Sequence, residues 1–218
     1  MWKEPKIELN NDVLCWVNMN LPAEMETAEK VPEVRPDIVE SYRDFQPPGR
    51  LRKTVDDLVD AVPPKYLVGL RKIVLTNQAA LTRDQRRKKV WSRRKMYRLA
   101  ESLGSYSRAW KSSPATVWLY VDNIFKAAPS WVSRVPLLRH TIVGTVLYHE
   151  IGHHIHAVHR PVYDGKENVA EDWSRKLGRQ FIRQRYWYLM PVLYPVSYLL
   201  NLGKRIRKLL RRRLTPQS

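Results

Sequence analysis

The chain has 218 residues and carries 39 Lys and Arg against 21 Asp and Glu, which gives a formal net charge of +18. Its hydrophobic residues (44%), with eight tryptophans among them, are ample for the core of one folded domain, and the single cysteine, Cys15, excludes an intramolecular disulfide. No apolar signal core follows Met1, so we expect a cytoplasmic protein.

The first 50 residues differ in charge from the rest. Residues 1–50 hold ten acidic and six basic side chains, whereas residues 51–218 hold 11 acidic and 33 basic ones. Six prolines interrupt the first segment, which has little sustained periodicity. We therefore predict an acidic, proline-rich extension over residues 1–50 that is only partly ordered. Such an arm could fold over a basic domain as an autoinhibitory cover.

Apolar spacing predicts the first elements of the folded domain. Residues 51–62 repeat apolar side chains every three or four positions and stop at Pro63, which predicts an amphipathic helix. Residues 69–76 and 115–121 are rich in β-branched and apolar side chains and predict two strands, with residues 105–110 as a third strand candidate.

Positive charge is concentrated from Arg83 to Arg98, where nine of the side chains are Arg or Lys. They are interleaved with Val90, Trp91, Met96 and Tyr97. We predict a helix here whose basic face could lie along the phosphates of a nucleic acid while its apolar residues face the core.

The next predicted helix carries the most informative motif, His149-Glu150-x-x-His153. Residues four apart on a helix point the same way, so the two imidazoles could share one metal ion. Glu150 is the only charged residue between Thr141 and Val158. It is placed to act as general base, by taking a proton from a water molecule that the metal activates.

A catalytic zinc site usually takes three protein ligands, so a third must lie downstream. Glu167 is our preferred candidate and His159 the alternative, because His156 stands where a glycine would be needed to turn the chain toward His159. Glu167 begins a predicted second helix whose buried face is formed by Ala170, Trp173, Ser174 and Leu177. One turn beyond, Glu171 could accept a hydrogen bond from the free ring nitrogen of a ligand histidine.

Peptide hydrolysis at such a site usually needs a further tyrosine or histidine to stabilise the oxyanion. The candidates in the sequence are His156, Tyr163 and Tyr186, and the sequence does not choose among them. The neighbouring His154 is expected either to take no part or to help at the oxyanion.

Residues 149–153 (His-Glu-Ile-Gly-His) and residues 167–174 (Glu-x-x-Ala-x-x-Trp-Ser) are separated by thirteen residues. Together they resemble the minimal gluzincin metallopeptidases of the ImmA/IrrE type, which pair a His-Glu-x-Gly-His helix with a Glu-x-x-Ala-x-x-Phe-Ala helix. The resemblance covers residues 138–185. It implies that His149, His153 and Glu167 bind Zn²⁺ and that Glu150 is the catalytic base.

The chain departs from that family at Trp173 and Ser174, which replace Phe and Ala, and at Glu171, which replaces an Asn. The resemblance implies a zincin-like α+β fold over residues 51–185, in which a small, mostly antiparallel sheet precedes the two helices. In the proteins that the chain resembles, the strand before the active-site helix is an edge that pairs with the peptide substrate. We predict residues 115–121 for this edge, with a fully paired interior strand as the open alternative.

Residues 186–218 form a third region. No charged residue lies from Tyr186 to Leu202, and the polybasic run Lys204 to Arg213 follows directly. Two prolines and Asn201 make the apolar stretch a poor spanning helix. Its tyrosines and tryptophan suit an interface, so residues 186–213 could attach peripherally to an anionic membrane surface at the inner face of the membrane, or pack on the core.

The residues therefore predict a zinc-dependent metalloendopeptidase that acts on a protein or peptide substrate. Two alternatives remain at this point. In one, the chain is a nucleic-acid-associated protein or a DNA-associated protease whose basic charge matters most. In the other, it is a peripheral membrane protein in which the metal site is secondary.

Overall fold

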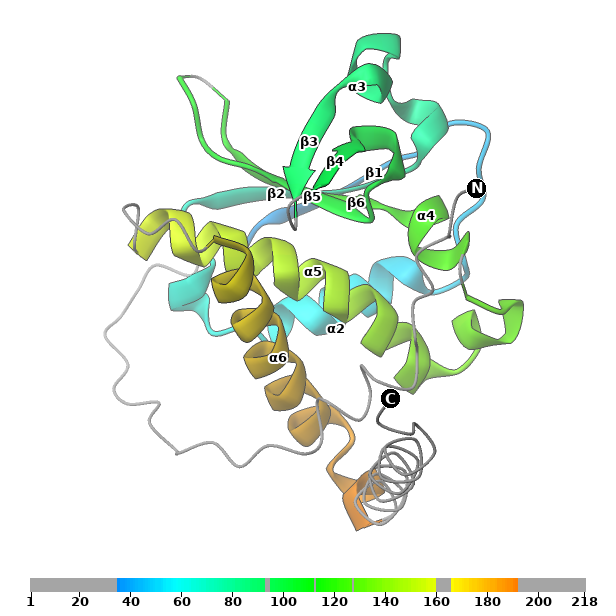
Figure 1. Ribbon diagram of the computed structural model, residues 1–218. Coiled ribbons are helices and arrows are strands. Elements are labelled where there is room, and N and C mark those ends of the chain that lie inside the picture. Colours follow the sequence, from blue (N-terminus) through cyan, green and yellow to red (C-terminus); the bar gives the residue numbers. More distant parts are fainter. Residues whose placement is uncertain (1–34, 93–94, 112, 127, 160–165, 192–218) are drawn as a thin grey trace, which may run out of the picture.

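The computed structural model describes residues 35–92, 95–111, 113–126, 128–159 and 166–191 (Figure 1). Its main sheet has the strand order β1-β2-β6-β5, with β1 at Asp37–Ser41, β2 at Leu70–Thr76, β6 at Ala115–Tyr120 and β5 at Gly104–Ser107. A separate hairpin pairs β3 (Lys89–Ser92) with β4 (Lys95–Arg98). The helices are α2 (Leu51–Asp60), α3 (Arg83–Arg87), α4 (Val121–Lys126), α5 (Pro136–His159) and α6 (Lys166–Arg185). The 3₁₀ turns are η1 (Pro64–Tyr66), η2 (Gln78–Ala80), η3 (Leu99–Glu101), η4 (Ser130–Ser133) and η5 (Trp187–Leu189).

The α+β class predicted from the sequence is confirmed, and the predicted elements fall close to the observed ones. The helix predicted over residues 51–62 is α2, and its apolar stripe is buried. The strands predicted over residues 69–76 and 115–121 are β2 and β6. The third candidate, residues 105–110, contains most of β5 but ends earlier, at Ser107.

The sheet is mixed, so the prediction of a mostly antiparallel sheet is wrong. β1 pairs with β2 and β2 pairs with β6 in parallel, and only β5 runs antiparallel to its neighbour β6. The connections explain this result. Each parallel pair is joined by a long crossover, through α2 in one case and through the segment from α3 to β5 in the other. β5 and β6 are consecutive strands joined as a hairpin, so they run antiparallel.

β6 lies inside the sheet, between β2 and β5, so residues 115–121 are not the open edge that we predicted. β5 is the edge strand instead. Its four residues pair with residues 116–119 on one side only, and its register runs from Gly104 opposite Leu119 to Ser107 opposite Thr116. The open alternative for residues 115–121, a fully paired interior strand, is the one observed.

The opposite edge strand, β1, falls inside the segment predicted to be a partly ordered extension. Its residues pair in parallel with Lys72–Thr76, and Ile38 is buried in the core. The folded unit therefore includes residues upstream of residue 51, because β1 pairs with β2 along its whole length. Residues 1–34 lie outside the described residues, and so does any cover that they provide.

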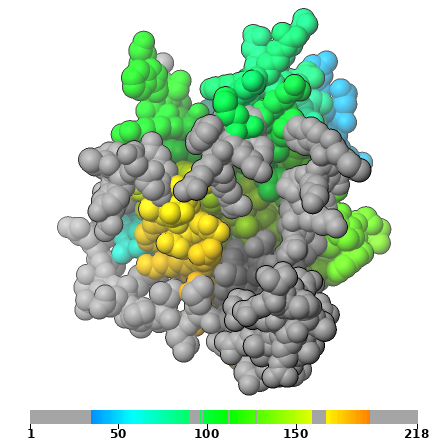
Figure 2. Space-filling view, in the orientation of Figure 1, coloured from blue at the N-terminus to red at the C-terminus, as the bar shows by residue number. Residues whose placement is uncertain are grey.

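The segment from Arg83 to Arg98 is not one helix, so that prediction is wrong. A capping box between Thr82 and Gln85 starts the short helix α3, and the chain then turns into the hairpin β3–β4. In its register Val90 is opposite Tyr97 and Trp91 is opposite Met96, and β-branched and aromatic residues such as Val, Trp and Tyr are enriched in strands. In this basic arm (residues 82–98) α3 lies at the outer end and β3 runs from it toward the main sheet (Figure 1), and the blue-green atoms of the arm form part of the molecular surface (Figure 2). A nucleic-acid contact through it stays a prediction.

Helices α2, α5 and α6 lie on one side of the main sheet (Figure 1). α5 is the central helix, since it contacts β5 and β6 of the sheet, α2, and α6. The core between them is formed by fully buried side chains that include Ile73, Leu75, Val117 and Leu119 of the sheet and Leu147 and Ile151 of α5.

After α6 the chain places Tyr186 in the core, while Trp187 and Tyr188 are exposed. Residues 192–218, which hold most of the apolar stretch and the polybasic run, lie outside the described residues. In the part of the chain that the structure describes, no helix has the length and apolar character needed to cross a membrane. Peripheral membrane attachment stays a prediction.

A buried histidine makes the stability of the fold depend on pH. His140 on α5 contacts the Pro136 carbonyl oxygen at 2.7 Å, the Tyr186 hydroxyl at 2.9 Å and an Asp57 carboxylate oxygen at 3.4 Å. Burial lowers the pKa of His140 below its ordinary value of 6.5, although the hydrogen bonds with Pro136 and Asp57 oppose this effect. Below about pH 6.5 the unfolded chain therefore binds a proton that the folded chain resists.

We expect the free energy of unfolding to fall as the pH drops from about 6.5 toward the lowered pKa, by at most about 1.4 kcal/mol per pH unit from this residue. The variant His140→Phe keeps a ring against Phe181 and removes the titration. Urea unfolding at pH 5.5 and 7.5 should therefore show a smaller pH dependence in the variant than in the wild type. Equal pH dependence in the two proteins would contradict this role for His140.

Candidate metal centre

The two histidines of the predicted motif stand on one face of α5. This helix is held in place by Leu147 and Ile151, which are fully buried against the sheet. Because these residues face the core, His149 and His153 face away from it, and their side chains keep about a fifth of their surface exposed. α5 runs on through His156 to His159, as the absence of a glycine at position 156 indicated.

Glu167 reaches the histidines because α6 packs unusually close to α5. A Cβ atom added at Gly152 would lie 2.8 Å from both the Cα atom and the carbonyl oxygen of Ala170. The Ser174 hydroxyl also donates a hydrogen bond to the Thr145 carbonyl oxygen at 3.1 Å. Glu167 lies one turn before Ala170 on α6, so this contact brings its carboxylate over the two imidazoles. The predicted buried face of α6 is confirmed for Ala170, Ser174 and Leu177.

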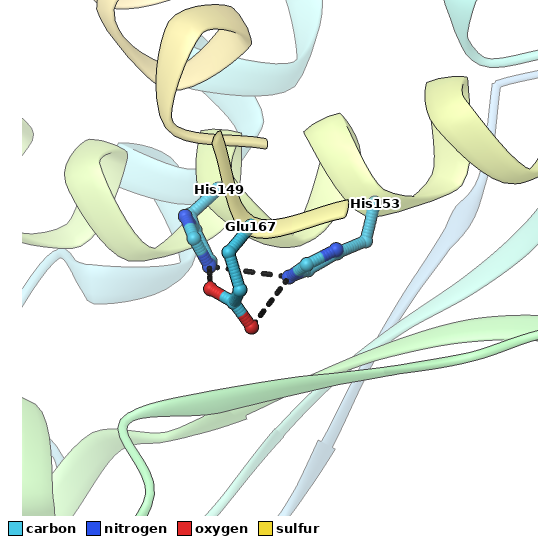
Figure 3. A group of neighbouring side chains, drawn as sticks. All are labelled: His149, His153 and Glu167. Atoms are coloured by element: carbon cyan, nitrogen blue, oxygen red, sulfur yellow. Dashed lines mark hydrogen bonds and ion pairs between the residues drawn. The ribbon is translucent and has the colours of Figure 1, made fainter. Parts of the chain in front are cut away.

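Three donor atoms converge at this point (Figure 3). The Nε2 atoms of His149 and His153 are 3.2 Å apart. Of the two Glu167 carboxylate oxygens, Oε2 lies 3.4 Å from Nε2 of His149 and Oε1 lies 3.9 Å from Nε2 of His153. A tetrahedral ion with ligands at about 2.0–2.1 Å separates them by roughly 3.3 Å. Among the described residues, this is the one group of His, Cys, Asp and Glu side chains that could hold a metal ion.

Glu150 is buried beside this group, with 7% of its surface exposed. The pKa of its carboxyl is raised from 4.5 to about 8, mainly by burial and also by the charge of Glu167, while a hydrogen bond with the Tyr106 backbone acts in the opposite direction. Two carboxylates so close together, one of them buried, are costly unless a cation neutralises them. The residues therefore suit a divalent cation, whose charge would lower the pKa of Glu150 again.

The edge strand β5 approaches Glu150 closely, and sequence reasoning missed this contact. A Cβ atom at Gly104 would lie 3.0 Å from both Cγ and Oε1 of Glu150, and 2.9 Å from Cγ1 of Val146. Only a residue without a side chain allows strand and helix to come so near. The one signal in the sequence was a glycine at the start of a short strand candidate.

The other predicted site residues are more dispersed. The Glu171 carboxylate accepts a hydrogen bond from Arg175 at 2.9 Å, and its predicted support of a ligand histidine is not among the contacts that the structure describes. His156 is buried, and its Nε2 atom has no hydrogen-bond partner among the described residues. Tyr163 lies outside the described residues. So does the side chain of His159, the alternative ligand, although its backbone ends α5.

Tyr186 is not brought to the three donors. Its hydroxyl contacts Nδ1 of His140, which precedes His149 by nine residues, or about 13 Å along the helix axis. Tyr186 is therefore not placed to stabilise an oxyanion at this site, and His156 and Tyr163 are left as the candidates.

No family model, curated protein or solved structure matches the chain. The resemblance of residues 138–185 to the gluzincins thus rests on the motif residues themselves.

Proposed function

We propose that the chain is a zinc-dependent metalloendopeptidase of the gluzincin type, in which His149, His153 and Glu167 hold Zn²⁺. The observation that supports this most is the convergence of two imidazole nitrogens and one carboxylate, whose ligand atoms lie within 4.8 Å of one another, with a second carboxylate, Glu150, buried next to them. Two histidines and a glutamate are a donor set that zinc accepts in peptidases. The zincin-like fold is part of the same proposal.

Zinc at this position would supply a Lewis acid, which makes a water molecule more acidic and polarises the scissile carbonyl. Glu150 acts as the general base: its carboxylate accepts a proton from the attacking water at one oxygen and passes it to the leaving amine nitrogen. The water oxygen first forms a C–O bond to the carbonyl carbon, the C–N bond then breaks as the amine nitrogen takes the proton, and a carboxylic acid and an amine are released. A buried base suits this task because few water molecules compete for its proton.

The open edge of β5 provides a place for the substrate. The Leu103 carbonyl oxygen accepts the Tyr120 N–H at 2.9 Å, so alternate residues of β5, Ser105 and Ser107, direct their main-chain groups to β6. The N–H and C=O groups of Gly104 and Tyr106 then face the open edge. An extended peptide can pair with such an edge by main-chain hydrogen bonds, which suits cleavage within a chain rather than at its end.

Removal of the metal tests the proposal. We expect the purified protein to cleave an unfolded casein reporter, to lose this activity in 1,10-phenanthroline, and to regain it with one equivalent of Zn²⁺. The isomer 1,7-phenanthroline, which does not chelate, is the matched control and should leave the activity unchanged. Cleavage by protein from which all metal has been removed, or no cleavage by protein with one zinc bound per chain, would refute the proposal.

A further inference from the structure

α5 presents a row of side chains to the edge strand. Val146, Glu150 and His154 are each four residues apart and therefore lie on one stripe of the helix. Gly104 of β5 lies against the first two of them, and the Tyr106 side chain contacts the third. Residues 104 and 106 share one face of the strand, so β5 lies along this stripe directly above Glu150.

His154 is buried and is bonded at both ring nitrogens, with 1% of its surface exposed. Nε2 lies 3.0 Å from the Val68 carbonyl oxygen, and Nδ1 lies 3.1 Å from the Tyr106 hydroxyl. Since a carbonyl oxygen only accepts, Nε2 carries the proton, and Nδ1 is left to accept the O–H of Tyr106. The two rings also stack edge to face, with 5.5 Å between their centroids.

The Val68 carbonyl oxygen, which accepts the hydrogen bond from His154, is held in position by the backbone. Gly69 has a φ of +86°, a conformation that side-chain-bearing residues rarely adopt, and it sets the direction of the preceding Val68 carbonyl. Leu70 then begins β2, which is paired on both sides within the sheet. His154 therefore links the edge strand to the start of an interior strand, through the helix that carries the metal centre.

The link through His154 adds to the contacts that β5 makes with β6 and with α5. β5 has four residues and one neighbouring strand, and its other edge is open. Main-chain groups of Tyr106 face that open edge, and Gly104 of the same strand lies against the Glu150 side chain. A shift of β5 would therefore move the substrate-pairing groups and a contact of the general base together.

We infer that Tyr106 and His154 are positioning residues, which form a strut that holds the open edge of β5 at a fixed height over Glu150. This inference rests on the proposed peptidase function, in which the edge pairs with the substrate main chain. Neither residue takes part in bond breaking. Their role is to bring the scissile carbonyl to the same place in each encounter, and misplacement by about 1 Å can lower a rate about 100-fold.

The variant Tyr106→Phe removes only the hydroxyl of the strut. The control is Tyr186→Phe, which removes a buried tyrosine hydroxyl that also contacts a histidine, 2.9 Å from Nδ1 of His140 and away from the metal centre. We expect kcat of the zinc-loaded Tyr106→Phe protein on the casein reporter to fall at least 10-fold, with zinc still bound at one per chain. Tyr186→Phe should keep kcat within about twofold, because it loses a comparable hydrogen bond elsewhere.

Hydrogen exchange of the β5 amides gives a second readout that needs no activity. These amides should exchange at least 10-fold faster in Tyr106→Phe than in the wild type, and at the wild-type rate in Tyr186→Phe. The variant His154→Asn offers a side-chain oxygen near the position of Nδ1, so it should restore part of the protection that His154→Leu loses. Unchanged exchange in Tyr106→Phe, or equal loss of kcat in both tyrosine variants, would overturn the strut. Wild-type protein that cleaves nothing would refute the peptidase proposal, and the exchange rates would still decide the strut.

Discussion

Replacement of Glu150 by glutamine is expected to lower kcat for peptide hydrolysis by about 10²- to 10⁴-fold, the usual contribution of a general base. The amide has the same shape but cannot accept the proton of the attacking water. Zinc content should stay at one per chain, because Glu150 is not among the three converging donors. The measurement is steady-state kinetics on the casein reporter, with zinc determined in the same samples.

A loss of this size cannot come from unfolding. Burial raises the pKa of the Glu150 carboxyl to about 8, so its charged form is unfavourable in the folded, metal-free chain. The neutral glutamine removes that cost, and we expect metal-free Glu150→Gln to be at least as stable as the wild type at neutral pH. Asp172→Asn makes the same chemical change on an exposed residue of α6 and should keep kcat within about twofold. Near wild-type activity in Glu150→Gln would show that another residue is the base.

Gly152→Ala is expected to have the largest effect on the metal centre without changing a ligand. Its added methyl group would stand 2.8 Å from two backbone atoms of Ala170, which cannot move unless α6 moves. We expect a loss of about 1–3 kcal/mol in the free energy of unfolding, as for other overpacked contacts. Because Glu167 shifts with α6, zinc affinity should also fall, by at least about 10-fold. Urea unfolding and competition with a zinc-binding dye measure the two effects.

Gly49→Ala is the matched control, since a Cβ atom at Gly49 meets nothing within 4 Å. It should leave both quantities nearly unchanged. In an unconstrained helix, alanine is more favourable than glycine by about 1 kcal/mol. If the Gly152→Ala protein were more stable than the wild type and bound zinc equally well, this result would contradict the close packing of α5 on α6.

Local spacing was sufficient to predict the three converging side chains. The separation of His149 and His153 by four residues places them on one face of any helix. The buried face formed by Ala170, Ser174 and Leu177 predicts that α6 packs with Glu167 directed toward that helix. Both inferences need only the period of a helix, and the position of α6 against α5 agrees with them.

The surroundings of these residues could not be predicted because they depend on long-range pairing. Nothing near Gly104 in the sequence shows that it will face Glu150, 46 positions later. Strand order follows from crossovers, and the pair Ile38 and Val39 between Asp37 and Glu40 was too weak a signal for β1. In the basic arm, the many Arg and Lys residues, which are good helix formers, led us to predict a helix, whereas Val90 pairs with Tyr97 in a hairpin.

The central claim is that His149, His153 and Glu167 hold a zinc ion, and X-ray absorption at the zinc edge tests it most directly. For the purified protein we predict one zinc per chain, with a first shell of nitrogen and oxygen atoms only, at about 2.0–2.2 Å, and scattering from two imidazole rings. Glu167→Ala should lose most of the zinc, while the exposed Asp172→Asn keeps it. Two results would contradict the claim. One is purified wild-type protein that holds less than one zinc per chain, and the other is a Glu167→Ala protein that holds one zinc per chain and gives the wild-type absorption spectrum.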